Sequence, residues 1–267
     1  PFHRTLVIRL LWSVAYGGIL IAQAVEALNA LNPGHTPHTI NYKFVARAKT
    51  EDPLLFRVRA LADGNIASVF VYQNEILVGI CHVRYDTKKE LLDSSLIRCP
   101  IYGPPNEYPT MEDAAHSRPR HVQELMLAAS KYPIEGRPIE SPLFPLSKHT
   151  RYSIWMRIKP QFRDEIKPSD GLSVALFMSD YGIQRVAIET FMKNGIRVIT
   201  FSLHHSVWVH EQSIDPLGWY FFVSECAVLS HGRFRIEMHL FDELRKCVMT
   251  VVQEALFQRV QTRSSKI

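Results

Sequence analysis

Four side chains in the C-terminal half of the chain could together activate a water molecule. They are a carboxylate, a hydroxyl, an imidazole and an amide: Asp180, Ser202, His204 and Gln253. Asp180 ends an apolar helical pattern and falls three residues after Phe177, so we expect its carboxylate to point along the buried stripe of a helix. A carboxylate there is costly unless polar groups meet it, and with such partners it could act as a general base. The alternative is an ordinary polar residue at a helix end.

The hydroxyl and the imidazole belong to a strand pattern at residues 200–211, where polar residues alternate with β-branched and aromatic ones. Because side chains alternate across a strand, one face is predicted to carry Ser202, His204, Ser206, Trp208 and His210. A second strand pattern, at residues 250–256, carries the amide. We therefore expect carboxylate, hydroxyl and amide to converge from three consecutive core elements around one water. The imidazole is either a second acid–base group or ligand contact, or a histidine satisfied by neighbouring backbone or water.

Three short motifs in this region resemble signatures of the acyl-CoA thioesterase II (TesB-like) family. Met178-Ser179-Asp180 matches the small-Ser-Asp motif of that family. Residues 251–255 match its Val-x-Gln-Glu-Gly/Ala motif. Residues 202–210 match Thr/Ser-x-Asp-His-Ser-x-Trp-x-His, except that His204 replaces the aspartate.

The resemblance implies an α+β, double hotdog fold, with two helix-plus-antiparallel-sheet repeats joined by a long linker. We expect residues 1–85 to form the N-terminal hotdog, residues 86–138 a proline-rich linker, and residues 139–267 the C-terminal hotdog with the site. Periodicity predicts helices at 17–31 and 168–181, and strands at 38–48, 54–61, 66–85 (folded at 73–75), 152–158, 198–210, 219–229, 233–242 and 247–260. The linker, with one helical pattern near residues 121–129, is either a ligand-contacting lid or a covering crossover connection.

The residue roles of the family, carried over position by position, define a candidate site. Asp180 would be the base or water-orienting carboxylate, and Ser202 and Gln253 would bind the same water. Gly17-Gly18 is similar to the family's Gly-Gly helix start. Free N–H groups there could bind a carbonyl oxygen or phosphate of the substrate, or the glycines could serve tight packing of the helix against the sheet. Trp208 is a further candidate substrate contact. No metal or redox cofactor is implied.

The leading hypothesis is an acyl-CoA thioesterase that releases free acid and coenzyme A. Two departures from the family pattern keep an alternative open: His204 is added, and the Arg-Arg run expected after the Asp63-Gly64 turn is not kept. The alternative is a divergent lyase, isomerase or cyclase of a specialised biosynthetic pathway, with Asp180 and His204 as an acid–base pair. A third interpretation is a ligand-binding or assembly protein with a decayed site.

Composition and charge limit the classes of molecule that the protein is expected to bind. The net charge is +5 and the sequence pI is about 9.0, but Lys and Arg are scattered, which argues against nucleic acid and suits the phosphates of coenzyme A. No apolar run approaches the ~20 residues of a spanning helix, so no membrane span is expected. The four cysteines lack Cys-x-x-Cys spacing and indicate neither a zinc site nor a disulfide framework. Three of them are expected to be small buried hydrophobic residues.

Location and assembly are predicted more coarsely. We expect an intracellular protein whose last residues, Ser265-Lys266-Ile267, resemble the Ser-Lys-Leu peroxisomal address, and otherwise a cytoplasmic one. The natural chain is expected to begin upstream of Pro1, because an initiator methionine is missing and relatives usually carry a further strand at that end. A homo-oligomer is expected by analogy with other hotdog proteins.

Overall fold

The computed structural model of the chain describes residues 15–31, 35–60, 65–85, 97–117, 120–139, 151–193 and 196–260. The Asp63-Gly64 turn, the first residues of the chain and the C-terminal Ser265-Lys266-Ile267 lie outside the described residues. None of the helices in the described part combines the length and the apolar character that crossing a bilayer requires.

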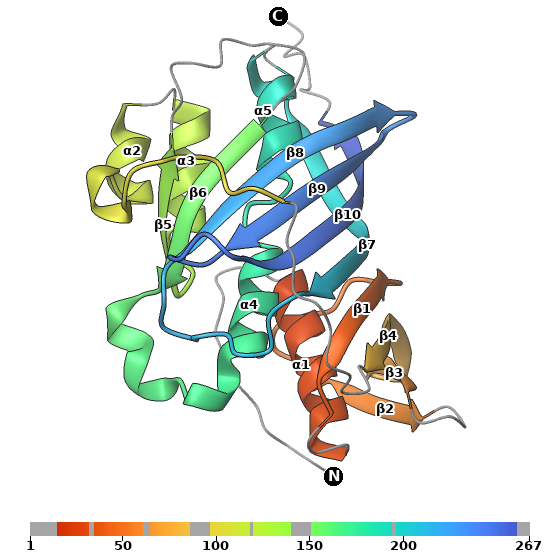
Figure 1. Cartoon of the computed structure of the whole chain (residues 1–267). Helices are drawn as coiled ribbons and strands as arrows, with labels where there is room; N and C mark the ends of the chain where they lie inside the picture. Colours follow the sequence, from red (N-terminus) through yellow and green to blue (C-terminus); the bar gives the residue numbers. More distant parts are fainter. Residues whose placement is uncertain are drawn as a thin grey trace, which may run out of the picture.

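All ten strands of the described chain form one antiparallel sheet (Figure 1). The strands of the first half are β1 (Pro37–Phe44), β2 (Leu55–Ala60), β3 (Ile66–Gln73) and β4 (Ile76–Tyr85). Those of the second half are β5 (Ile134–Ile139), β6 (Arg151–Ile158), β7 (Val198–Val209), β8 (Tyr220–Ser230), β9 (Arg233–Phe241) and β10 (Cys247–Arg259). The order across the sheet is β2-β3-β4-β1-β7-β10-β9-β8-β6-β5. The two halves are therefore joined where β1 pairs with β7, with Tyr42 opposite His205.

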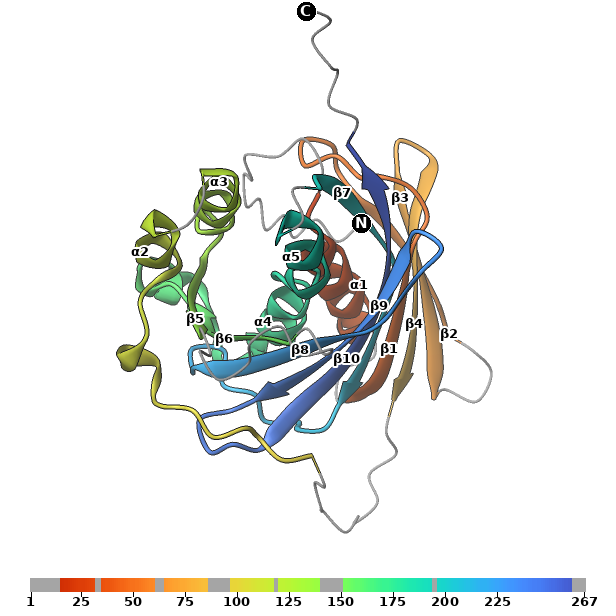
Figure 2. The same ribbon diagram turned by 90° about the horizontal axis from the view of Figure 1, so that it is seen from above.

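Three helices lie inside the curve of this sheet (Figure 2). They are α1 (Gly17–Leu31), α4 (Gly171–Ser179) and α5 (Arg185–Lys193). The apolar spacing that predicted α1 supplies its buried side: Leu20, Ile21, Ala24, Val25 and Leu28. The predicted fold-back within residues 66–85 is the β3–β4 turn, where Asn74 and Glu75 both have positive φ. The predicted order of helix followed by antiparallel strands is confirmed in each half.

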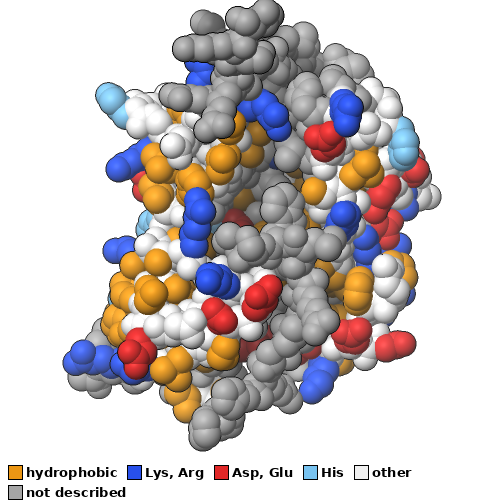
Figure 3. All heavy atoms as spheres, turned by 180° about the vertical axis from the view of Figure 1, so that it is seen from behind, with side chains coloured by type: hydrophobic (Ala, Val, Ile, Leu, Met, Phe, Trp, Pro, Cys, Tyr) orange, Lys and Arg blue, Asp and Glu red, His pale blue; other side chains and the backbone are white. Residues whose placement is uncertain are grey.

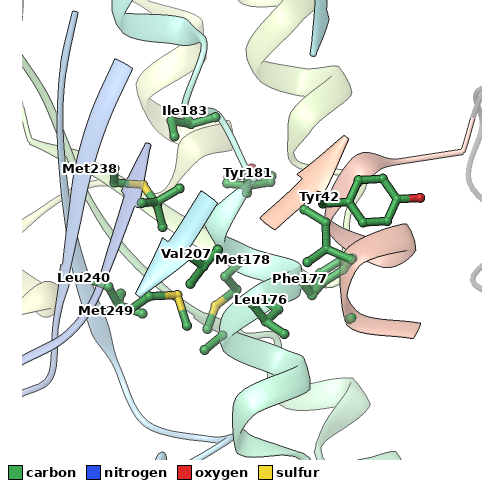
Figure 4. Packing of buried hydrophobic residues seen from close by; sticks show 14 of the residues in the cluster. Tyr42, Leu176, Phe177, Met178, Tyr181, Ile183, Val207, Met238, Leu240 and Met249 are labelled. Atoms are coloured by element: carbon green, nitrogen blue, oxygen red, sulfur yellow. The ribbon is translucent and has the colours of Figure 1, made fainter. Parts of the chain in front are cut away.

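The core fills the space between the sheet and the buried helices. Helix α4 is buried along nearly its whole length, which fits a segment that is apolar all round. Its side chains and those of the neighbouring strands form one cluster, in which Figure 4 labels Leu176, Phe177, Met178, Val207, Met238, Leu240 and Met249. Of the three cysteines predicted to be buried, Cys81 and Cys247 are buried and Cys226 is partly buried. The site described below lies at the C-terminal end of α4.

The segment predicted as a linker is more structured than expected. Residues 86–138 contain a short 3-10 helix η1 (Pro105–Glu107), α2 (Met111–His116), α3 (Arg120–Ala129) and most of β5. Strand β5 pairs with β6 and alternates buried and partly buried residues. Pro138 makes the segment look unlike a strand in the sequence. The residue is tolerated because β5 is an edge strand of the sheet. Helix α5 was also not predicted. The division at residues 85/86 and 138/139 remains a prediction.

Charged side chains are interspersed on the molecular surface. On the face shown in Figure 3, basic, acidic and hydrophobic residues alternate over the described part. Several described cations are paired with carboxylates, as Arg235 is with Glu237, and as Arg137 and Arg157 are with Glu135. Cations that are paired in this way form no continuous basic stripe of the kind that follows a nucleic-acid backbone.

Candidate active site

The C-terminal end of α4 meets the N-terminal end of α1 at Asp180. The backbone N–H of Gly18 donates a hydrogen bond to Asp180 Oδ2 over 3.2 Å. A Cβ atom at Gly17 would lie 2.7 Å from the same oxygen, and one at Gly18 would lie 2.4 Å from the carbonyl oxygen of Phe177. Two helix ends can approach this closely only where Cβ atoms are missing. The glycines therefore serve close packing, of Gly18 against α4 and of Gly17 against both Asp180 and Phe44 of β1, and they lie beside the predicted base.

The side-chain amide of Gln253 links Asp180 to Ser202. Gln253 lies on β10 and is fully buried. Its Nε2 group donates one hydrogen bond to Asp180 Oδ1 and one to Ser202 Oγ, each over 2.8 Å. Its Oε1 atom is buried and has no hydrogen-bond partner among the described residues. The structure thus brings carboxylate, hydroxyl and amide together from a helix and two neighbouring strands.

Burial changes the acidity of Asp180. The residue as a whole is only partly buried, yet its carboxylate is enclosed by protein. This burial raises the pKa of Asp180 to about 7, although the hydrogen bonds from Gln253 and Gly18 act in the opposite direction. A carboxylate with a pKa near neutrality is a stronger base than an exposed aspartate. At a pH near 7 it can both accept a proton and release it again.

Two tyrosines that the sequence pattern did not single out, Tyr16 and Tyr132, lie near the carboxylate, and a third, Tyr181, packs against Tyr132. Tyr16 precedes the glycine pair, Tyr181 follows Asp180, and Tyr132 comes from the connection between the two halves. The ring centroid of Tyr132 lies 5.0 Å from that of Tyr16 and 5.9 Å from that of Tyr181. Burial, together with the nearby charge of Asp180, raises the pKa of Tyr132 to about 12, so its hydroxyl stays protonated at neutral pH. The predicted linker thus contributes a side chain beside the candidate base.

A second amide, also missed, contacts the hydroxyl of Ser202. Nε2 of Gln184 donates a hydrogen bond to Ser202 Oγ over 2.8 Å. Gln184 directly precedes α5, the helix that the sequence pattern did not predict. A polar residue ahead of an unrecognised helix carries no motif, so nothing in the sequence pointed to this contact.

A bulge in β7 separates Ser202 from the other polar residues of the strand. Glu254 of β10 pairs with His204, whereas the next residue, Ala255, pairs with Ser202. Leu203 is therefore the extra residue of the ladder, and it reverses the alternation of side chains. Ser202 lies on the inner face, towards the helices, and His204 lies on the outer face. The prediction that these two residues share a face is wrong for this reason.

His204 and Trp208 belong to the outer face of the sheet. His204 Nε2 lies 3.2 Å from Ser206 Oγ, which donates a hydrogen bond to Asn41 Oδ1 over 2.8 Å. Burial and the neighbouring charge of Lys43 lower the pKa of His204. The two predicted site residues border an outer cavity of about 420 Å³, which the candidate base does not line. The structure therefore does not bring His204 or Trp208 to the inner-face network.

His205, on the inner face, links β7 to the end of α4 by a hydrogen bond. Ser179 Oγ donates to the carbonyl oxygen of Leu176 over 2.8 Å, so it accepts from His205 Nε2 at 3.0 Å. Burial lowers the pKa of His205 to about 3, which keeps the imidazole neutral. Because Ser179 is the residue before Asp180, this contact fixes the strand against the helix end that carries the candidate base.

Family comparisons agree with the fold and the motifs. The family model of the acyl-CoA thioesterase C-terminal domain matches residues 105–257, and that of the acyl-CoA thioesterase N-terminal domain matches residues 9–75. The chain belongs to the acyl-CoA thioesterase family. The resemblance stated from the three C-terminal motifs is thereby confirmed.

Solved structures of low sequence identity share the fold of this thioesterase-family protein. The acyl-CoA thioesterase II TesB2 from Mycobacterium marinum has 18% identity and a TM-score of 0.73, covering 92% of this chain and 90% of that chain. A tesB protein from Mycobacterium avium subsp. paratuberculosis has 20% identity and a TM-score of 0.71, with coverages of 92% and 88%. A protein with a hot dog fold from Alicyclobacillus acidocaldarius has 17% identity and a TM-score of 0.68, with coverages of 93% and 89%. The predicted double hotdog fold is confirmed.

Proposed function

We propose that this member of the family hydrolyses acyl-CoA thioesters with a water molecule held by Asp180, Ser202 and Gln253. The observation that carries the proposal is the buried amide of Gln253, which donates to the carboxylate and to the hydroxyl at once. Folding alone gives no reason to enclose a carboxylate at the end of an apolar helix, because its burial is costly. Membership of the acyl-CoA thioesterase family supplies the substrate class.

In the proposed reaction the water donates hydrogen bonds to Asp180 and to Oε1 of Gln253. The first group is the base, and the second is a buried acceptor without a partner among the described residues. The water oxygen attacks the thioester carbonyl carbon while its proton passes to Asp180, and the carbonyl π-electrons move to the oxygen. When the tetrahedral intermediate collapses, the C–S bond breaks. Coenzyme A leaves as a thiolate, which takes up the proton from Asp180, and the carboxylic acid is released.

The developing negative charge on the carbonyl oxygen needs a donor. The first turn of α1 presents the N–H of Gly17 and the positive end of the helix dipole beside Asp180, whereas the N–H groups of Ile19 and Leu20 donate to the carbonyl oxygen of Tyr16. Since the N–H of Gly18 is engaged with the carboxylate, we assign the N–H of Gly17 as the donor to the thioester carbonyl oxygen. The glycine pair would then serve both the close packing of the helices and the binding of substrate.

The lyase, isomerase or cyclase alternative loses its basis. It required Asp180 and His204 to act as an acid–base pair on one substrate. The bulge at Leu203 turns His204 to the outer face of the sheet, whereas Asp180 is bonded to the inner-face Gln253. The decayed-site interpretation is separated from hydrolysis by the experiment below, because it predicts that Asp180 can be replaced without effect.

The test is a panel of acyl-CoA esters of graded chain length, with the released thiol measured for the parent, Asp180→Asn and Asp164→Asn. Asp164 is an exposed aspartate in the segment before α4 and serves as the matched control. We expect the parent and the control to hydrolyse at least one ester. For Asp180→Asn we expect kcat to fall by roughly a thousandfold, since the base is removed. The kcat of the parent should rise with pH through about 7, where Asp180 ionises.

Two results would count against the proposal. If no ester of any length is hydrolysed by the folded parent, the function is wrong. If Asp180→Asn hydrolyses its best ester as fast as the parent does, hydrolysis takes place elsewhere and the assigned mechanism is wrong.

A further inference from the structure

Gln184 is held in place by the start of α5. Its backbone carbonyl oxygen accepts hydrogen bonds from the N–H groups of Ala187 and Ile188, over 3.1 and 3.0 Å. It is thus the residue that caps the helix, four positions after Asp180. From this fixed backbone its side-chain Nε2 group reaches across to Ser202 Oγ on β7. The side chain is partly buried, so a donor of defined direction contacts the hydroxyl.

The hydrogen bonds around Ser202 leave its hydroxyl one role. A serine hydroxyl has one hydrogen to donate and two lone pairs that accept. Gln253 and Gln184 each donate an N–H to Ser202 Oγ over 2.8 Å, so both acceptor positions are occupied. The single hydroxyl hydrogen must therefore be donated, and it points to a group other than these two amides.

We propose that Gln184 is a positioning residue of the hydrolytic site, which fixes the Ser202 hydroxyl as a donor to the attacking water; this inference rests on the proposed function. The water then donates its two hydrogens to Asp180 and to Oε1 of Gln253, and accepts one from Ser202. One lone pair of the water remains, and it is the pair that attacks the carbonyl carbon. In this arrangement one water satisfies all three groups at once.

The same count of donors and acceptors explains why one amide is not enough to orient the Ser202 hydroxyl. With Gln253 alone bound to Ser202 Oγ, one lone pair of the hydroxyl would be open and could accept a hydrogen from the water. The water would then be turned so that a hydrogen, not a lone pair, faces the thioester. The second amide, from Gln184, removes that orientation.

Two variants of similar size separate positioning from packing. Gln184→Met keeps the volume and removes the donor, whereas Gln184→Glu replaces the donor by a carboxylate that accepts the hydroxyl hydrogen. We expect both to lower kcat by between about tenfold and a hundredfold, with KM little changed. The deficit of Gln184→Glu relative to the parent should shrink as pH falls, because a protonated carboxyl group can again donate to Ser202. The deficit of Gln184→Met should not depend on pH. Gln258→Glu, at an exposed position of β10, should match the parent at every pH.

A spectroscopic measurement tests the contact without turnover. The side-chain NH₂ signals of Gln184, identified by their loss in Gln184→Glu, should shift in a ¹⁵N correlation spectrum when Ser202 is replaced by alanine, and those of Gln258 should not. A parent that hydrolyses no ester overturns the proposed function, and the role of Gln184 falls with it. A parent that hydrolyses, but whose Gln184 variants keep the parental kcat or share one pH-independent deficit, overturns only the role of Gln184. Unshifted signals in Ser202→Ala would likewise remove the contact on which that role depends.

Discussion

The two faces of strand β7 carry similar polar side chains in different surroundings. On the inner face Ser202 is bonded to two amides, and His205 is bonded to Ser179 beside the candidate base. On the outer face Ser206 is bonded to His204 and to Asn41, beside a cavity of about 420 Å³. Residue type alone does not separate the two groups.

The two faces differ in whether their side chains are hydrogen-bonded to a buried carboxylate. Asp180 has its pKa raised to about 7 by burial, and the inner-face amide of Gln253 donates directly to it. The pKa of the outer-face His204 is lowered by burial and by the adjacent Lys43, and the carboxylate that faces it, Glu254, is partly exposed and paired with Arg233. Under the proposed function, hydrogen-bond connection to one enclosed acid, and not polarity in a core strand, distinguishes the reactive side. The five substitutions below test it.

Gln253→Ala should have the largest effect on this comparison. It removes the donor to both Asp180 and Ser202, so we expect kcat to fall by roughly a thousandfold. Because the hydrogen bond from Gln253 lowers the pKa of Asp180, its loss should move the rising limb of any residual pH–rate profile to higher pH. Gln258→Ala, five residues along the same strand, is the control. A limb that moves to lower pH would contradict this account.

The pair Ser202→Ala and Ser206→Ala compares the two faces with the same substitution. We expect the inner-face variant to lose about a hundredfold in kcat, because the hydroxyl that orients the water is gone. The outer-face variant should stay within about twofold of the parent, since its partners are His204 and Asn41. Equal losses, measured on the best ester of the panel, would show that the faces do not differ in function.

Asp180→Asn should also change stability in a pH-dependent way. The pKa of Asp180 is about 7 in the folded chain and about 4 in the unfolded chain, so folding retains a proton that the unfolded chain has released. The unfolding free energy of the parent should therefore fall as pH rises from about 4 to about 7, and level above that. The variant lacks this loss, so its stability relative to the parent should increase over the same window by up to a few kcal/mol. Denaturant titrations of the parent and of Asp180→Asn at several pH values measure the difference.

His204→Ala should have the smallest effect. Its side chain lies on the outer face, bonded to Ser206, so we expect kcat within about twofold of the parent and a change in unfolding free energy below about 1 kcal/mol. Steady-state kinetics and chemical denaturation measure both quantities. A loss of activity comparable with that of Ser202→Ala would restore His204 to the reactive side.

The sequence predicted the elements of the site better than its geometry. The helix before Asp180 follows from a continuous apolar segment, and the strands that carry Ser202 and Gln253 follow from their alternating pattern and their β-branched residues. The bulge at Leu203 could not be predicted, because an extra residue in one strand depends on its partner strand and leaves no periodic trace of its own.

The residues contributed from elsewhere were missed for a related reason. Tyr132 enters from a proline-interrupted connection and Gln184 precedes a short amphipathic helix, so neither lies within a recognisable motif. The approach of Tyr132 to Asp180 and of Gln184 to Ser202 is a tertiary property. Local propensity and patterning say nothing about which distant segments a buried carboxylate will meet.

The contact between Gly18 and Asp180 joins residues 162 positions apart in the chain. Each half of the polypeptide can build its own strands, but the assigned oxyanion donor and the assigned base come from different halves. Turnover would accordingly appear only once the halves have docked, later than the first secondary structure. The rate at which hydrolysis recovers during refolding would then measure this last assembly step. Circular dichroism, which follows strand formation, would not detect it.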